Sequence, residues 1–268
     1  MPRPMPFVRE AGAGPGVVCL HSNASNSSQW RGLLDILSPD YRVLAPDSYG
    51  AGKSPDWPSD RRISLQDEVE FVEPVLAAAG TPFSLVGHSY GAAIALIAAL
   101  AHPGRVQALA LYEPTLFSLI ERDSPAPNAA DGIRRAVNAS SLALDEGDPA
   151  EAAKHFIDYW MGPSSWDNTP DARKAPIAAS IVNVRRWGHA LLTEPATLEV
   201  FRTLDIPVLY MVGKDSRPSA LEVARLLTGA LPRVAVVEFD GLGHMGPITH
   251  APQVNGVIAD FLASQSAA

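Results

Sequence analysis

The chain has 268 residues and a formal net charge of −8, enough length for one sizeable hydrophobic core with an inserted subdomain. The acidic balance disfavours nucleic acid and anionic membrane surfaces as partners, and it favours a small-molecule substrate. A single cysteine excludes an internal disulfide, and the absence of a zinc-ligand spacing predicts no metal site. The longest apolar run, residues 92–101, is too short to span a bilayer.

Short apolar runs alternate with helical stretches along the chain. The N-terminal segment MPRPMPFVRE lacks the continuous apolar core of a signal peptide, so we expect a cytoplasmic protein. The alternation predicts an α/β fold, with a mostly parallel central sheet flanked by helices. Strands are predicted at residues 6–9, 17–21, 42–46, 83–87, 106–112, 208–213 and 234–239, and helices at 29–37, 64–79, 90–101, 219–231 and 252–264.

The strand pattern stops after Glu113 and resumes only near Ile206. Apolar residues between them recur at helical spacing, notably in residues 150–160, 171–187 and 196–204. We therefore expect a helical cap, or lid, at residues 114–205, inserted in a core formed by residues 1–113 and 206–268. Trp160 and Trp187 lie in this cap, where they either pack it onto the sheet or line a substrate pocket.

The segment Gly87-His88-Ser89-Tyr90-Gly91 is a G-x-S-x-G pentapeptide. An apolar predicted strand precedes it and a helix of small residues follows it, so Ser89 falls on a strand-to-helix turn. Such a turn strains the nucleophile's backbone, and the two glycines leave room for the tight bend. The context predicts that Ser89 is a nucleophile.

Four segments follow one another along the chain: His21 after one predicted strand, Asp47 to Ser54 (DSYGAGKS) after the next, the pentapeptide around Ser89, and Gly243-His244-Met245 near the end. In this order they make the chain similar to the α/β-hydrolase fold family, as an esterase-like member with a serine nucleophile and a helical cap. The resemblance implies a Ser-acid-His triad, backbone amides as an oxyanion hole and no cofactor.

His244 is the best candidate for the base that a serine hydroxyl needs. It lies in the glycine-flanked loop after the last predicted strand, where the family places its histidine. We expect His21 and His88 to orient backbone instead of transferring protons. Met245, next to His244, is a candidate for the substrate pocket, together with Trp160 and Trp187.

The triad acid has two candidates. Asp215 follows the strand whose end usually supplies the acid in this family, but it is one residue early, and the usual position holds Ser216. Glu113 follows the strand at residues 106–112, where haloalkane dehalogenases and some relatives place their acid. A carboxylate at that buried strand end needs a partner, and an imidazole would supply one. We therefore prefer Glu113 and keep Asp215 as the alternative.

The family position of the oxyanion hole predicts two backbone amides, those of Tyr90 and Asn23. Together these residues predict a serine hydrolase that cleaves ester or related acyl bonds of a small, apolar substrate. The first alternative is hydrolysis of a carbon–carbon bond in a ring-cleavage diketone, with the same triad and a deeper pocket. The second is a noncatalytic ligand-binding protein on the same fold. The sequence leaves the oligomeric state open, a homo-oligomer included.

Overall fold

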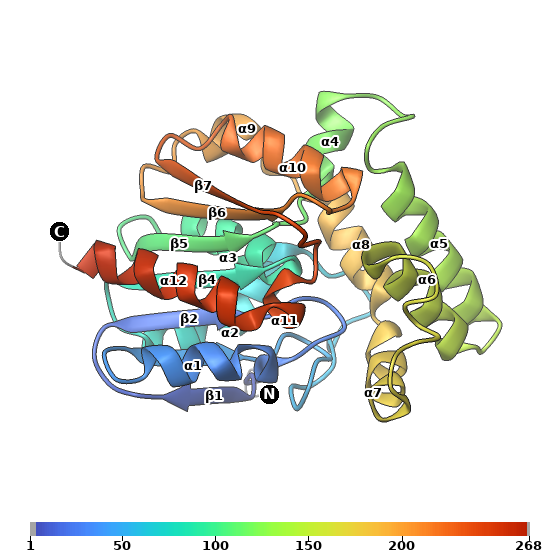
Figure 1. Ribbon diagram of the computed structural model, residues 1–268, viewed down its shortest axis with the longest axis horizontal. Coiled ribbons are helices and arrows are strands. Elements are labelled where there is room, and N and C mark those ends of the chain that lie inside the picture. The colour runs from blue at the N-terminus through green and yellow to red at the C-terminus, as the bar shows by residue number, and fades with distance from the viewer. Residues whose placement is uncertain (1–3, 267–268) are drawn as a thin grey trace.

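The computed structural model describes residues 4–266, which form a single sheet with helices on both faces (Figure 1). Residues 1–3 and 267–268, the outer ends of the two predicted core segments, lie outside the described residues. The sheet has seven strands in the order β1-β3-β2-β4-β5-β6-β7. Only β1 runs antiparallel to its neighbour, β3, and the other pairs are parallel. The predicted α/β fold is therefore confirmed.

The strands lie close to their predicted positions. The N-terminal strand starts two residues later than predicted, because its register is set by antiparallel pairing of Val8 with Pro46. The bounds are β1 Val8–Ala11, β2 Gly16–Leu20, β3 Arg42–Pro46, β4 Phe83–His88, β5 Val106–Tyr112, β6 Val208–Gly213 and β7 Val234–Phe239.

Successive side chains of the central strands point to opposite faces, and each face has its own core cluster. Val18, Leu85 and Leu109 pack on the face covered by α2 (Leu65–Ala78), α3 (Tyr90–Ala101) and α10 (Pro218–Thr228). Val17 and Val86 pack on the other face, against α1 (Arg31–Leu37) and α12 (Ala251–Ser266). A short 3-10 turn, η1 (Ser27–Trp30), precedes α1, and α11 (Gly246–Thr249) precedes α12. Burial on both faces explains why these strands are continuous apolar runs.

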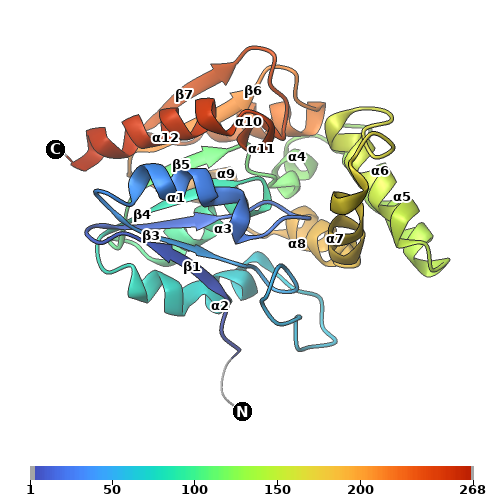
Figure 2. The same cartoon turned by 60° about the horizontal axis from the view of Figure 1, so that its bottom comes forward.

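The chain between β5 and β6 is helical, and its larger helices lie beyond one end of the sheet (Figures 1 and 2). We call residues 114–205 the insertion. Its helices pack on one another, with α5 against α6 and α8 and α6 against α7. They are α4 Phe117–Asp123, α5 Asp131–Asp145, α6 Pro149–Met161, α7 Asp171–Ile181, α8 Val184–Thr193 and α9 Leu198–Phe201.

The stretch at residues 171–187, where apolar residues recur at helical spacing, is helical but not continuous, because the chain turns at residues 182–183 between α7 and α8. Asn183 is buried, and its side-chain amide donates to the Gly50 carbonyl at 3.3 Å and accepts from Arg186 at 2.9 Å. A polar side chain with partners outside the helix competes with a continuous helix at this point. The spacing of apolar residues along the sequence gives no signal for this contact between distant segments.

Candidate active site

Ser89 lies on the turn between β4 and α3, with φ 57° and ψ −116°. This left-handed φ is strained for a residue with a side chain, and strain of this kind is concentrated at functional sites. Its amide donates to the Tyr112 carbonyl at 2.9 Å, which fixes the turn against β5. A Cβ on Gly91 would come within 2.2 Å of the Leu20 carbonyl, so only glycine lets α3 start this close to β2.

His244 lies in the loop after β7 and contacts both Ser89 and Glu113. Its Nε2 is 2.9 Å from Ser89 Oγ, and its Nδ1 is 2.6 Å from Glu113 Oε2. All three side chains are almost completely buried. The contact to the carboxylate places the imidazole proton on Nδ1 and leaves Nε2 free to accept the serine proton.

Glu113 follows β5 directly and is fully buried, with φ 44°. Its second oxygen, Oε1, accepts from the Gly213 amide at 2.8 Å and from the Ser216 hydroxyl at 2.5 Å. With His244, three donors therefore surround this carboxylate. A buried carboxylate is tolerated when it is paired and hydrogen-bonded in this way.

Asp215, the alternative acid, is solvent-exposed. Its amide donates to the Leu242 carbonyl at 2.9 Å, which ties the loop after β6 to the loop of His244. Within residues 4–266 no hydrogen bond or ion pair joins the Asp215 side chain to His244. The structure thus brings Ser89, His244 and Glu113 together and leaves Asp215 outside the cluster.

The indole of Trp160, on α6, stacks on the His244 imidazole. The ring centroids are 3.8 Å apart and the planes differ by 21°. Trp160 is itself buried and packs edge-on against Tyr159 and Phe156. The insertion therefore reaches the site directly, through a residue that the sequence singled out.

A chain of hydrogen bonds links the loop after β2 to the loop of His244. Gln29 Oε1 accepts from the Ser22 amide at 3.1 Å, and Gln29 Nε2 donates to His88 Nδ1 at 3.1 Å. His88 Nε2 donates to the His244 carbonyl at 2.8 Å. Burial, and then the neighbouring His244, holds the pKa of His88 well below its ordinary value. His88 is therefore neutral, with its proton on Nε2, as this chain requires.

His21 does not reach Ser89. Its Nδ1 donates to the Ser22 carbonyl at 2.7 Å, and its Nε2 accepts from the Ser48 amide at 3.0 Å. Both contacts orient backbone in the loops after β2 and β3. Burial lowers the pKa of His21, which favours this neutral, bridging form.

A match to the family model for the α/β hydrolase fold covers residues 15–251. This chain belongs to the α/β hydrolase family. The hydrogen-bonded set of Ser89, His244 and Glu113 lies within the matched residues. Cys19, also within them, is a buried thiol whose pKa is raised by burial, so it is a core residue in this α/β hydrolase.

Relatives of this α/β hydrolase are named for different activities. It is 28% identical to a pimeloyl-[acyl-carrier protein] methyl ester esterase of Methylococcus capsulatus, over 96% of this chain and 98% of the relative. It is 26% identical to a 2-hydroxymuconate semialdehyde hydrolase of a Pseudomonas species, over 98% and 88%. The crystal structure of an α/β hydrolase from Sphaerobacter thermophilus superposes with a TM-score of 0.74 at 24% identity, over 96% of both chains. The last similarity confirms the fold.

Three cavities adjoin the site of this α/β hydrolase. One of them, of about 360 Å³, is lined by His244, Met245 and Trp160, among others. The other two are an inner and an outer cavity that share lining residues. The inner cavity of about 20 Å³ is lined by Ser89, Thr115 and Trp187, among others. The outer cavity of about 530 Å³ is lined by Met245 and by residues of α6 and α7. Asn23, Phe156 and Trp160 line both. Every pocket residue predicted from the sequence thus borders the inner or the outer cavity, whereas Phe156 and Thr115 were not predicted.

Residues 4–266 contain neither a membrane-spanning helix nor a metal-binding cluster. In that range no helix combines the length and apolar character needed to cross a membrane. The same residues contain no cluster of three or more histidine, cysteine, aspartate or glutamate side chains arranged to hold a metal ion.

Proposed function

We propose that this chain is a serine hydrolase that cleaves an ester bond through an acyl-enzyme. The observation that carries the proposal is the continuous line of hydrogen bonds from Glu113 through His244 to Ser89, at 2.6 Å and 2.9 Å. A base within hydrogen-bond reach of the nucleophile, itself oriented by a third group, is the arrangement that nucleophilic catalysis needs. Membership of the α/β hydrolase family and the esterase among its relatives support the same reaction.

In the proposed mechanism, His244 Nε2 takes the proton of Ser89 while Oγ attacks the ester carbonyl carbon. The bond from that carbon to the alcohol oxygen then breaks, and His244 returns its proton to the leaving alcohol. Water, deprotonated by the same nitrogen, attacks the acyl-enzyme and releases the acid and Ser89. Glu113 stays ionised and stabilises the imidazolium that forms in each half of the reaction.

We assign the oxyanion hole to the backbone amides of Tyr90 and Asn23. Tyr90 is the first residue of α3, and N–H groups in the first turn of a helix have no carbonyl partner within it. Asn23 borders the inner cavity, together with Ser89, and the outer cavity, and its loop is held by the bond from Ser22 to Gln29. Amides fixed before the reaction stabilise the developing negative charge without reorganising.

We also assign the insertion, residues 114–205, the role of a cap over a core formed by the rest of the chain. Trp160 and Trp187 are buried and line the inner cavity together with Ser89, and residues of the insertion also form most of the lining of the outer cavity. The cap therefore supplies most of the surface that a substrate would contact.

The test is hydrolysis of p-nitrophenyl acetate by the wild type and by Ser89→Ala, with folding checked by circular dichroism. We expect the variant to lose about three orders of magnitude or more in kcat, because it keeps only the oxyanion hole and binding contributions. Ester hydrolysis that survives undiminished in Ser89→Ala contradicts the proposal.

Hydrolysis of a carbon–carbon bond in a ring-cleavage diketone is the second candidate. The relative named as a 2-hydroxymuconate semialdehyde hydrolase favours this candidate, because the match covers 98% of this chain. The same Ser89, His244 and Glu113 would serve both reactions. Turnover of 2-hydroxymuconate semialdehyde by a wild type inactive on p-nitrophenyl acetate decides for this candidate.

A further inference from the structure

The inner cavity, which is lined by Ser89, and the outer cavity differ in size and chemistry and share three lining residues, Asn23, Phe156 and Trp160. The Oδ1 of Asn23 is buried there without a hydrogen-bond partner among residues 4–266. A buried polar atom without a partner points to a ligand that supplies one. A substrate that crosses this junction would extend into both cavities, one portion on each side of the scissile bond.

The position of His244 decides which portion enters which cavity. The leaving alcohol must accept its proton from His244, so it lies on the side of that histidine. His244 lines a third cavity, of about 360 Å³. That cavity shares Met161, Met245 and Thr249 with the outer cavity and none of these with the inner one. Met245 and Thr249 follow His244 in the chain, as does Ile248, which also lines the outer cavity. The inner cavity is lined by Ser89 and by none of these residues that follow His244.

We infer that the substrate is an ester of a short acyl group and a larger, polar alcohol, with the acyl group in the inner cavity and the alcohol in the outer one. This inference rests on the proposed function. It narrows the expectation of a small, apolar substrate, because the apolar portion is assigned to the inner cavity and the outer cavity takes a polar group. In a methyl ester the alcohol portion is smaller than the acyl portion, whereas the inferred substrate has the larger alcohol portion.

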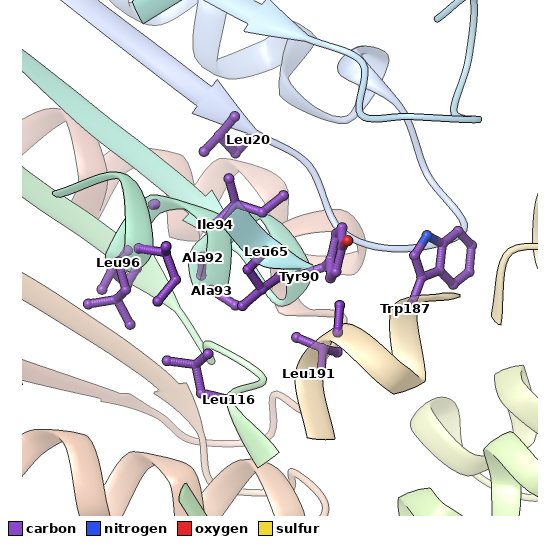
Figure 3. Close-up of a cluster of buried hydrophobic side chains, with 14 of the residues drawn as sticks. Leu20, Leu65, Tyr90, Ala92, Ala93, Ile94, Leu96, Leu116, Trp187 and Leu191 are labelled. Carbon is purple, nitrogen blue, oxygen red and sulfur yellow. The ribbon is translucent and has the colours of Figure 1, made fainter. Parts of the chain in front are cut away.

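The inner cavity is too small for a long acyl chain. Its volume of about 20 Å³ is only slightly larger than the roughly 10–15 Å³ that a cavity needs to hold one water molecule. Trp187 and Leu191 of α8 are buried and belong to the same hydrophobic cluster as Tyr90 (Figure 3). A Cβ on Gly188 would come within 2.8 Å of Val137 Cγ1, which shows how closely α8 and α5 approach. We therefore expect an acetyl or propionyl group to fit and longer chains to require displaced side chains.

The outer cavity suits a polar alcohol. Its volume is about 530 Å³, and several hydroxyl and amide side chains line it, among them Ser25, Asn26, Asn168 and Thr169. Arg173 is the one charged residue of the lining, and it is solvent-exposed. Hydroxyl, amide and guanidinium groups can bind hydroxyls or a single anionic group on the alcohol.

Two esters that place the same ring on opposite sides of the bond test the inference. We would measure acid release from 4-hydroxyphenethyl acetate and from methyl 4-hydroxyphenylacetate. The inference predicts that kcat/KM is at least about tenfold higher for the acetate, since a misplaced ring must displace packed side chains. Equal values, or a preference for the methyl ester, overturn it. If p-nitrophenyl acetate is also not hydrolysed, the proposed function itself fails; if it is hydrolysed, only the assignment of the cavities does.

A variant of the inner cavity supplies a second, independent measurement. Val137→Ala removes two methyl groups from that lining on a half-buried side chain. It is expected to raise the kcat/KM ratio of p-nitrophenyl hexanoate to p-nitrophenyl acetate by about tenfold. The matched control is Val200→Ala, an exposed valine of α9 that lines neither cavity, which should keep the wild-type ratio. A folded Val137→Ala protein with an unchanged ratio contradicts the acyl assignment.

Discussion

The Ser216 hydroxyl donates to the Glu113 carboxylate across the ends of two neighbouring strands, with 2.5 Å between Oγ and Oε1. β5 and β6 pair in parallel, with Tyr112 opposite Met211, so the residues that follow them meet at one edge of the sheet. Ser216 occupies the position at which the resemblance to the family predicted the acid. In this chain the serine supports a carboxylate that comes from the adjacent strand.

Removing that support should weaken catalysis without abolishing it. In Ser216→Ala, the buried carboxylate keeps the Gly213 amide and His244 but loses one donor. A hydrogen bond to a charged group contributes about 1.5–3 kcal/mol, so we expect kcat on p-nitrophenyl acetate to fall about tenfold or more. Ser264→Ala, on the exposed part of α12, is the matched control. A kcat equal to that of the wild type would show that Ser216 does not position Glu113.

Neutralising each of the two candidate acids should affect kcat very differently. Glu113→Gln keeps the shape of the side chain but removes the charge that stabilises the His244 imidazolium, and we expect kcat to fall by about 10³–10⁴. Asp215→Asn changes an exposed side chain outside the cluster, and kcat should stay within about twofold. Steady-state kinetics on p-nitrophenyl acetate measures both. The reverse pattern would assign the acid to Asp215.

Gln29 should matter although it contacts neither Ser89 nor His244 by its own side chain. It joins the Ser22 amide to His88, which in turn holds the His244 carbonyl. Gln29→Ala removes the partner of both the Ser22 amide and the His88 ring. The loop of Asn23 and the imidazole of His244 therefore lose their fixed geometry. We expect a drop of about tenfold in kcat with KM nearly unchanged. A rise in KM alone would instead indicate a role in binding.

The buried carboxyl of Glu68 should make the free energy of unfolding depend on pH. Burial raises the pKa of its carboxyl from the ordinary value of 4.5 to about 8, and its oxygens accept from the Tyr49 amide and the Tyr90 hydroxyl. Between pH 4.5 and about pH 8 the Glu68 carboxyl has released its proton in the unfolded chain but keeps it in the folded chain. The folded state therefore binds more protons, and the contribution of Glu68 to stability falls as the pH rises from about 4.5 to 8.

Glu68→Gln, which has no charge to bury, tests this dependence. We expect the free energy of unfolding of the variant, relative to the wild type, to increase steadily from pH 5 to pH 8 and to level off above it. Urea unfolding at pH 5, 6.5, 8 and 9 measures the difference. Parallel pH dependences for the two proteins would mean that Glu68 is ionised in the folded chain throughout this range.

The sheet and the positions of Ser89 and His244 could be predicted because the local sequence carries their signals. Strands buried on both faces are continuous apolar runs, and glycines flank both residues where the chain must turn tightly. The acid had to stay open, since the ends of β5 and β6 both carry a carboxylate. Which of these reaches His244 depends on three-dimensional contacts, here those that bury Glu113 and leave Asp215 exposed.

The insertion was predicted less well. The apolar spacing indicated helices, and Trp160 and Trp187 stood out as large aromatic residues, but their partners depend on how α5, α6 and α8 pack. The turn at Asn183 and the role of Phe156 in the inner and outer cavities follow from contacts between segments far apart in the sequence. Gln29 was missed for the same reason, because it lies 59 residues from His88.

The most direct test of the central claim is covalent labelling with a fluorophosphonate, which reacts with an activated serine. Peptide mapping by mass spectrometry would locate the adduct in the wild type, His244→Ala and Ser89→Ala. We predict one adduct, on Ser89, formed rapidly in the wild type, much more slowly in His244→Ala, and not at all in Ser89→Ala. An unlabelled wild type, or labelling of Ser89 that is equally fast without His244, would contradict the account.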